Sequence, residues 1–185
     1  MYGILFVNNV KRSITMPTRQ DFYNFHCPRY EEFPSLELYA EQVLSLMKDY
    51  LEIFHRDGAL LTSNMINNYV KQRIVKPPIN KRYDRVHLSY FVVVCLLKGF
   101  MNISELCEGL EIILEKNTVR DAYNLFCDEL EGALKRAFSE ESLPVPEKAD
   151  TTELALIRSM CTSLANLTLA HCVIEEKKLL PSDRR

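Results

Sequence analysis

The chain has 185 residues, of which 47% are hydrophobic, and this composition excludes a wholly disordered protein. Only 5 glycines accompany 9 phenylalanines and 9 tyrosines, so we expect long helices, few tight turns and a mainly α fold. The net charge of −2 gives no general attraction to nucleic acid, so the distribution of charge along the chain has to be examined.

Residues 1–33 show mixed polarity and no sustained hydrophobic period, and we interpret them as an N-terminal arm that either docks on the rest of the chain or stays loose. The first residues lack the basic start and the apolar run of a secretory signal. Pro34 then introduces a predicted helix over 36–54, whose apolar residues recur at the spacing of one helical face.

The stretch 61–83 carries the strongest signal in the sequence. With Thr62 as the N-cap, a helix over 62–73 places four apolar residues on one side, namely Met65, Ile66, Tyr69 and Val70. The opposite side has three amides and one ammonium group, namely Asn64, Asn67, Asn68 and Lys71. Three exposed asparagines lower helix stability by roughly 1–2 kcal/mol relative to lysine or glutamate, so a merely solvated surface explains them poorly. Because asparagine can bond to adenine N6 and N7 in the major groove, the pattern predicts a DNA-recognition helix.

Pro77 and Pro78 cannot continue that helix, and we expect a short extended excursion that returns at Tyr83. Asp84 is a suitable cap for the next helix, RVHLSYFVVVCLLKG, whose central run is apolar on every side and therefore needs burial all round. A valine-rich strand is the competing interpretation, but the cap and the length of about four turns favour a helix.

Residues 71–85 contain six basic side chains and one acidic side chain, a net charge of +5, whereas the rest of the chain has a net charge of −7. A basic island in an acidic protein is typical of a nucleic-acid contact, with a solvated basic loop as the alternative. In a major-groove complex we expect Asn67 and Asn68 to face base edges, and Lys71, Lys81 and Arg82 to lie beside phosphates. The predicted DNA-binding residues are Ser63, Asn64, Asn67, Asn68, Lys71, Arg73, Lys76, Lys81, Arg82 and Arg85.

Two further helices have clear start signals. Asn102 and Glu105 form a predicted capping box before one helix, and Thr118 with Asp121 opens another. Residues 139–149 combine charge with two prolines and are expected to connect this helix to the next.

The last predicted helix covers 151–177. Between 154 and 174 its only charged residue is Arg158, and apolar residues nearly encircle it, so most of its surface needs cover. The same chain or a partner subunit could provide that cover, and we predict a homodimer.

The six cysteines form no C-x-x-C pair, and we expect reduced, buried thiols in a cytoplasmic protein rather than zinc ligands or disulfides. Residues 159–174 carry no charge, but their serine, threonine and asparagine content is too high for a membrane span. The sequence has no convincing nucleotide loop, G-x-S-x-G, H-E-x-x-H or Cys-His nucleophile. It therefore predicts no enzyme activity, no cofactor and no metal site.

Three stretches, FPSLELYAEQV, LLTSNMINNYVK and KPPINKRYDRVHLSYFVVVCLLK, resemble the bacterial domain-of-unknown-function family 1836. The resemblance extends over 34–114. That family has no established activity, so the resemblance implies no mechanism.

Residues 61–110 also resemble the winged helix-turn-helix of MerR-type regulators. In that pattern a capped recognition helix with T-L-R-Y-Y precedes L-L, prolines, a wing closing on Arg-x-Tyr and a helix with acidic residues at its start. The corresponding positions here are Thr62, 65–69, Ile74, Val75, Pro77, Pro78, Tyr83 and 100–105. Asn67 and Asn68 replace an arginine and a tyrosine of the pattern, and the helix over 36–54 would replace the first helix of the motif.

This resemblance implies a MerR-like winged helix-turn-helix core with a short extended wing and a C-terminal helical bundle. The implied function is a transcriptional regulator that reads the major groove of double-stranded DNA with helix 62–73. A helix-turn-helix-derived protein-interaction module without DNA binding is the alternative. The implied regions are an N-terminal arm (1–33), a MerR-like helix-turn-helix domain (34–115) and a C-terminal helical dimerisation region (116–185), with a homodimer and no membrane contact.

Overall fold

The computed structural model describes residues 16–55, 59–144 and 146–179. The N-terminal stretch considered above for a secretory signal lies outside these residues. The described part is mainly helical, with seven α-helices and one two-stranded sheet, so the predicted mainly α fold is confirmed. None of the described helices is both long and apolar enough to cross a membrane.

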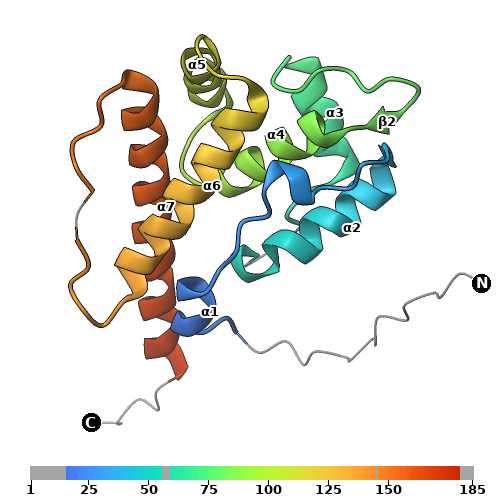
Figure 1. The fold of residues 1–185 in the computed structure, drawn as a ribbon. Coiled ribbons are helices and arrows are strands. Elements are labelled where there is room, and N and C mark those ends of the chain that lie inside the picture. Colours follow the sequence, from blue (N-terminus) through green and yellow to red (C-terminus); the bar gives the residue numbers. More distant parts are fainter. Residues whose placement is uncertain (1–15, 56–58, 145, 180–185) are drawn as a thin grey trace, which may run out of the picture.

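The helices follow one another along the chain as shown in Figure 1. They are α1 (Arg19–Tyr23), α2 (Ala40–Leu51), α3 (Ser63–Lys71), α4 (Arg85–Leu97), α5 (Ile103–Leu114), α6 (Val119–Phe138) and α7 (Thr152–Leu179). Two short 3₁₀ helices are η1 (Tyr30–Glu32) and η2 (Glu52–Phe54). Strand β1 (Leu38–Tyr39) pairs antiparallel with β2 (Arg82–Tyr83), with Leu38 opposite Tyr83 and Tyr39 opposite Arg82.

Helix α4 is the central element of the fold. It packs against α2 and β2 on one side of the molecule and against α6 and α7 on the other. All residues from Phe91 to Leu97 are buried, which matches the run that is apolar on every side. The helix interpretation of this run is therefore confirmed over the strand interpretation.

Helices α5, α6 and α7 form the second half of the molecule, with α7 packed mainly against α6 (Figure 1). Gly109 of α5 faces Met160 of α7, and a Cβ atom at this position would lie 2.8 Å from Met160 Cε, the flexible end of that side chain. The buried residues of both halves form one continuous hydrophobic core. The predicted division into three regions stays a prediction.

The four helix caps expected from the sequence are confirmed, at Thr62, Asp84, Asn102 and Thr118. Each side-chain oxygen accepts a hydrogen bond from a backbone N–H in the first turn, as when Thr62 Oγ1 accepts from Met65 at 3.1 Å. The capping box of Asn102 and Glu105 is complete in both directions.

The helix predicted over 36–54 is shorter than expected. Leu38 and Tyr39 are extended because their backbones pair with β2, and the chain tightens into η2 after Leu51. The prediction was therefore wrong at both ends of this helix, although Val43, Met47 and Leu51 form its buried side as the periodicity indicated.

The described part of the N-terminal segment docks onto α6. Phe22 stacks on Phe138 with ring centroids 5.0 Å apart, and Tyr123 Oη donates to the Pro28 carbonyl at 2.7 Å. The Arg29 guanidinium and the Cys27 N–H both donate to the Glu131 carboxylate, at 2.6 and 3.0 Å. This segment thereby links the first half of the fold to α6.

Candidate nucleic-acid interface

Helix α3 has a buried side and an exposed polar side. Ile66 and Tyr69 are buried, and the helix packs against α2 through this side. The opposite side consists of exposed Asn64, Asn67, Asn68 and Lys71. The amphipathic division predicted from the sequence is therefore confirmed, and none of these four polar side chains is covered by the described part of the chain.

The C-terminal end of α3 is closed by a Schellman motif with arginine in the left-handed position. The Ile74 N–H donates to the Tyr69 carbonyl at 3.0 Å, and the Arg73 N–H donates to the Val70 carbonyl at 3.1 Å. Arg73 has φ of 60°, where glycine is favoured and another residue costs about 1 kcal/mol. The Arg73 side chain is exposed at the end of α3.

A tight hairpin follows at residues 79–82, here called the 79–82 hairpin. The Arg82 N–H donates to the Ile79 carbonyl at 2.9 Å, and Ile79 and Arg82 form an antiparallel bridge. Asn80 and Lys81 have φ of 51° and 61°, as in a type I′ turn, whose second central position favours glycine. An exposed cation again stands where glycine would be less strained.

Three side chains share one face of the small sheet because their residues are directly opposed. Tyr39 pairs with Arg82, and Arg82 pairs with Ile79. The Arg82 guanidinium lies 4.5 Å from the centre of the Tyr39 ring and donates to the Tyr39 hydroxyl at 2.8 Å. Tyr39 is 51% exposed and Ile79 is 70% exposed, so this row is an accessible surface.

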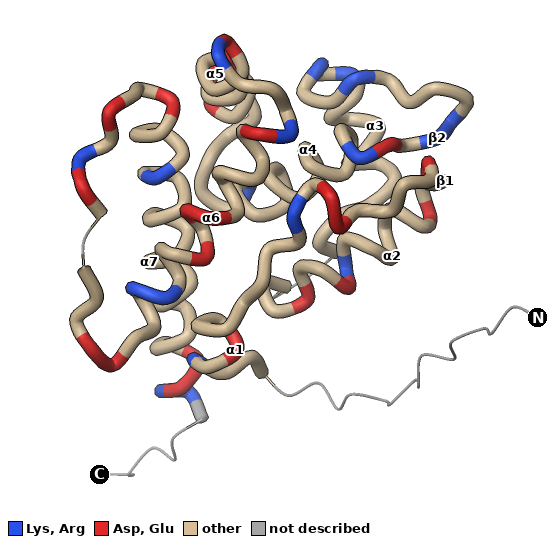
Figure 2. The backbone as a smooth tube through the Cα atoms, viewed as in Figure 1, with Lys and Arg blue, Asp and Glu red and all other residues tan. Residues whose placement is uncertain are grey.

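The charge of the stretch from α3 to β2 is of one sign. Figure 2 shows Lys and Arg, but no Asp or Glu, along α3, the following loop and β2. The sequence from 59 to 83 contains five basic residues and no acidic residue, and the basic residues are Lys71, Arg73, Lys76, Lys81 and Arg82. None of the five forms an ion pair with a described residue, whereas Arg29 and Arg158 are paired with Glu131 and Glu129 elsewhere in the fold.

The acidic residue after β2 is already engaged. Burial alone would raise the pKa of Asp84, but hydrogen bonds from the His87 backbone N–H at 3.1 Å and the His87 ring lower it below its ordinary value. The Asp84 carboxylate therefore stays ionised at neutral pH as the cap of α4.

Nine of the ten predicted DNA-binding residues are exposed on α3, the loop after it and the 79–82 hairpin. Arg85 differs, because it is half-buried and its guanidinium donates to the carbonyl groups of Phe33 and Pro34 at 3.1 and 3.3 Å. Its role is to fix the N-terminal segment against α4. Tyr39 was not predicted as a site residue, because its proximity to Arg82 depends on strand pairing across 43 residues.

The structure describes all six cysteines, and none of them forms a disulfide. Cys27, Cys95, Cys127 and Cys161 are buried as predicted, whereas Cys107 and Cys172 are only half-buried. Burial raises the pKa of Cys95 to about 12, so this thiol is protonated at neutral pH and is a poor nucleophile. Among the described residues, no three His, Cys, Asp or Glu side chains are grouped so that they could hold a metal ion.

Comparison with known proteins gives a family without an activity. No curated protein and no solved structure matches the chain. The family model of Domain of unknown function (DUF1836) matches residues 28–126, which include α2, α3, the small sheet, α4 and α5. This match covers more than half of the chain, and the protein therefore belongs to the DUF1836 family.

Proposed function

We propose that this protein is a DNA-binding transcriptional regulator that reads the major groove with α3. The observation that carries the proposal is the polar side of α3 together with five cations that have no ion pair among the described residues. Amides supply hydrogen bonds to base edges, and unpaired cations supply contacts to phosphates. The stretch 59–83 has no carboxylate that would repel the DNA backbone.

The order of elements supports a MerR-like winged helix-turn-helix as part of this proposal. A short strand precedes α2, α3 follows, and the 79–82 hairpin returns to pair with that strand before α4 begins. In this arrangement α3 is the recognition helix and the 79–82 hairpin is the wing. The connection between α2 and α3, residues 52–62, is longer than the turn of about 3–4 residues in a standard helix-turn-helix.

Each group of residues has a separate role in the proposed complex. Helix α3 has 9 residues, and an α-helix of about 10–12 Å diameter fits a major groove about 12 Å wide. Asn67 and Asn68 contact base edges. Arg73 and Lys81 contact phosphates on either side, and their strained backbone is consistent with a functional constraint on charge placement.

A homodimer also belongs to the proposal, because two-fold symmetric proteins of this class bind two half-sites. Its contact would be the outward side of α7, where Val173 and Ile174 are 38% and 51% exposed.

The direct test is fluorescence anisotropy with a duplex selected from a random-sequence pool and with a scrambled duplex of equal length. If all five cations contact phosphates, log Kd should change with log salt with a slope near 4.5, from a factor of about 0.9 per neutralised phosphate. The selected duplex should bind at least about 1,000-fold more tightly than the scrambled one. Equal affinity for both duplexes would refute sequence-specific recognition.

A protein-interaction module is the second candidate, and the exposed apolar surface beside the hairpin favours it. Leu36, Tyr39 and Ile79 are 79%, 51% and 70% exposed. Exposed aromatic and aliphatic side chains around an arginine are typical of protein interfaces. Absence of binding to either duplex at about 50 mM salt would favour this candidate, because phosphate contacts are strongest at low salt.

A further inference from the structure

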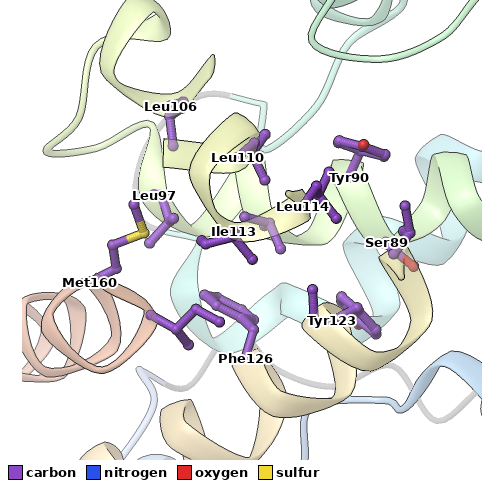
Figure 3. Close-up of a pocket in the computed structure, with 14 residues that line it drawn as sticks. Ser89, Tyr90, Leu97, Leu106, Leu110, Ile113, Leu114, Tyr123, Phe126 and Met160 are labelled. Atoms are coloured by element: carbon purple, nitrogen blue, oxygen red, sulfur yellow. The ribbon is translucent and has the colours of Figure 1, made fainter. Parts of the chain in front are cut away.

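An apolar cavity lies where α4, α5, α6 and α7 meet (Figure 3). Its volume is about 40 Å³. Met160 and Leu97 lie at one end of the ring of side chains and Tyr90 lies at the other. No charged residue lines the cavity.

The polar groups around this cavity are nearly all engaged. The Ser89 hydroxyl donates to the Arg85 carbonyl at 2.9 Å, and the Tyr123 hydroxyl donates to the Pro28 carbonyl at 2.7 Å. The Tyr90 hydroxyl makes no hydrogen bond with a described residue. The chemistry of the cavity is therefore a hydrocarbon wall with one free hydroxyl group.

The cavity as it stands is too small for an organic ligand, but Tyr90 lines both this cavity and a second one. A volume of 40 Å³ holds water-sized molecules only, because a benzene-sized ligand needs about 150 Å³. However, Tyr90 also lines a second cavity of about 180 Å³, between the loop at Pro77 and the first turn of α4. Tyr90 is thus part of the wall of both spaces.

We propose that the cavity between α4 and α7 binds a small, uncharged ligand with a single ring and one hydrogen-bonding group. The ring replaces Tyr90 against Leu110, Ile113 and Phe126, and burial of its apolar surface drives binding. The polar group of the ligand takes the place that the Tyr90 hydroxyl vacates. The displaced Tyr90 ring enters the second cavity, under the loop that leads to the 79–82 hairpin.

Because Tyr90 moves toward the 79–82 hairpin, ligand binding changes the surroundings of the hairpin. Any resulting change in DNA affinity rests on the function proposed above. Ligand binding itself does not depend on that function, so it is tested without DNA. Benzyl alcohol and benzoate are suitable probes because they have the same ring and nearly the same size, and only benzoate carries a charge that the cavity cannot pair.

Thermal unfolding in the presence of each probe tests the proposal. Benzyl alcohol at ten times its Kd should raise the Tm by about 3–6 °C, and benzoate at the same concentration should leave it unchanged. Hydrogen exchange of residues 74–83 should change with benzyl alcohol, because Tyr90 then occupies the space beneath them. Equal effects of the two probes, or no effect of either, would overturn the site.

Three variants locate the binding. Ala122→Val adds two carbon atoms to the cavity wall and Val93→Ile adds one, and each should abolish the Tm shift with benzyl alcohol. Either variant alone is sufficient if the other does not fold. Ile112→Ala changes a side chain of α5 that is 39% exposed and does not line the cavity, so it should keep the full shift. A full shift in a folded cavity-filling variant would contradict the proposed location.

Discussion

At the scale of single residues, the left-handed positions give the most specific information about function. Among the described residues, only Arg73, Asn80 and Lys81 combine positive φ with a side chain. Glycine would remove the backbone strain at all three positions. Two of them carry an exposed cation instead, and both cations lie on the proposed DNA-binding surface.

Replacing Arg73 or Lys81 by glycine should therefore weaken DNA binding without lowering the stability of the protein. Arg73→Gly and Lys81→Gly should unfold in urea at the same free energy as wild type or up to about 1 kcal/mol higher, because strain is removed while unfolded-chain entropy rises. Each should weaken binding to all duplexes and lower the salt slope by about one unit. Asn80→Gly is the control, since it also places glycine at a left-handed position but without loss of charge. An unchanged salt slope in both cation variants would remove these residues from the site.

Replacement of Asn67 should lower the selectivity for the DNA sequence and leave the salt slope unchanged, which is the opposite of the two cation variants. The side chain is exposed within α3, so Asn67→Ala should stabilise the protein by some tenths of a kcal/mol, up to about 0.7, through helix propensity. The same variant should lose about 1–3 kcal/mol of preference for the selected duplex, with its salt slope unchanged. Chemical denaturation and anisotropy titrations measure the two effects. A variant that is more stable and equally selective would show that Asn67 faces solvent in the complex.

At the scale of elements, local signals were sufficient for most helices. Thr62 and Asp84 cap helices within three residues of their partners, and such short-range contacts can be read from sequence. The pairing of Tyr39 with Arg82 could not be read, because two-residue strands have no usable alternation and the partners are 43 residues apart. The predicted helix consequently included Tyr39, and its exposed row with Arg82 was missed.

The docking of the N-terminal segment was unpredictable for the same reason. Its contacts with α6 span about 100 residues of sequence, as from Arg29 to Glu131. Arg85 shows the consequence for the site, because charge alone assigned it to DNA while the structure uses it to hold Phe33 and Pro34. The positive charge of Arg85 is evident from the sequence, but the carbonyl groups that accept its hydrogen bonds are not.

Glu131 should be the acid-sensitive anchor of this segment. Its side chain is 16% exposed; burial by itself would raise the pKa of Glu131, but hydrogen bonds from the Arg29 guanidinium and the Cys27 N–H lower it below 4.5. A lowered pKa means that the folded state favours the carboxylate, so this stability is present at neutral pH and is lost as the pH falls below about 4.5.

Glu131→Gln should therefore reduce the free energy of unfolding by about 1–3 kcal/mol at pH 7, because it weakens a charge-assisted hydrogen bond. The difference between wild type and variant should shrink steadily as the pH falls from 5 to 3. Urea unfolding at each pH measures it, and the difference isolates Glu131 from other carboxylates that titrate in this range. A constant difference across that range would show that the carboxylate charge is not what fixes the segment.

At the scale of the whole molecule, α4 and the core around it connect the proposed DNA-binding surface to the C-terminal helices. Only one side of α7 is needed for this core, where Ile157, Cys161 and Leu164 are buried. The charge of Arg158 is neutralised by Glu129, whose oxygens accept at 2.8 and 3.0 Å. The outward side of α7 presents small or uncharged residues at helical spacing, namely Ala155, Ser159, Thr162, Ser163, Asn166, Ala170, Val173 and Ile174.

That outward side is where we expect the homodimer contact. Small residues allow two helices to approach closely, and the exposed Val173 and Ile174 gain burial when they do. Sedimentation at micromolar concentration should give a dimer for wild type and a monomer for Ile174→Glu. The Ile174→Glu monomer should remain folded and unfold on heating in a cooperative transition. Ile112→Glu, a matched change at an exposed isoleucine of α5, should remain dimeric.

Leu164→Glu should instead unfold the protein, because Leu164 is 6% exposed within the core. A wild type that sediments as a monomer at 100 times that concentration would leave two-fold DNA recognition without a structural basis, and a single α3 would then have to account for all of the binding.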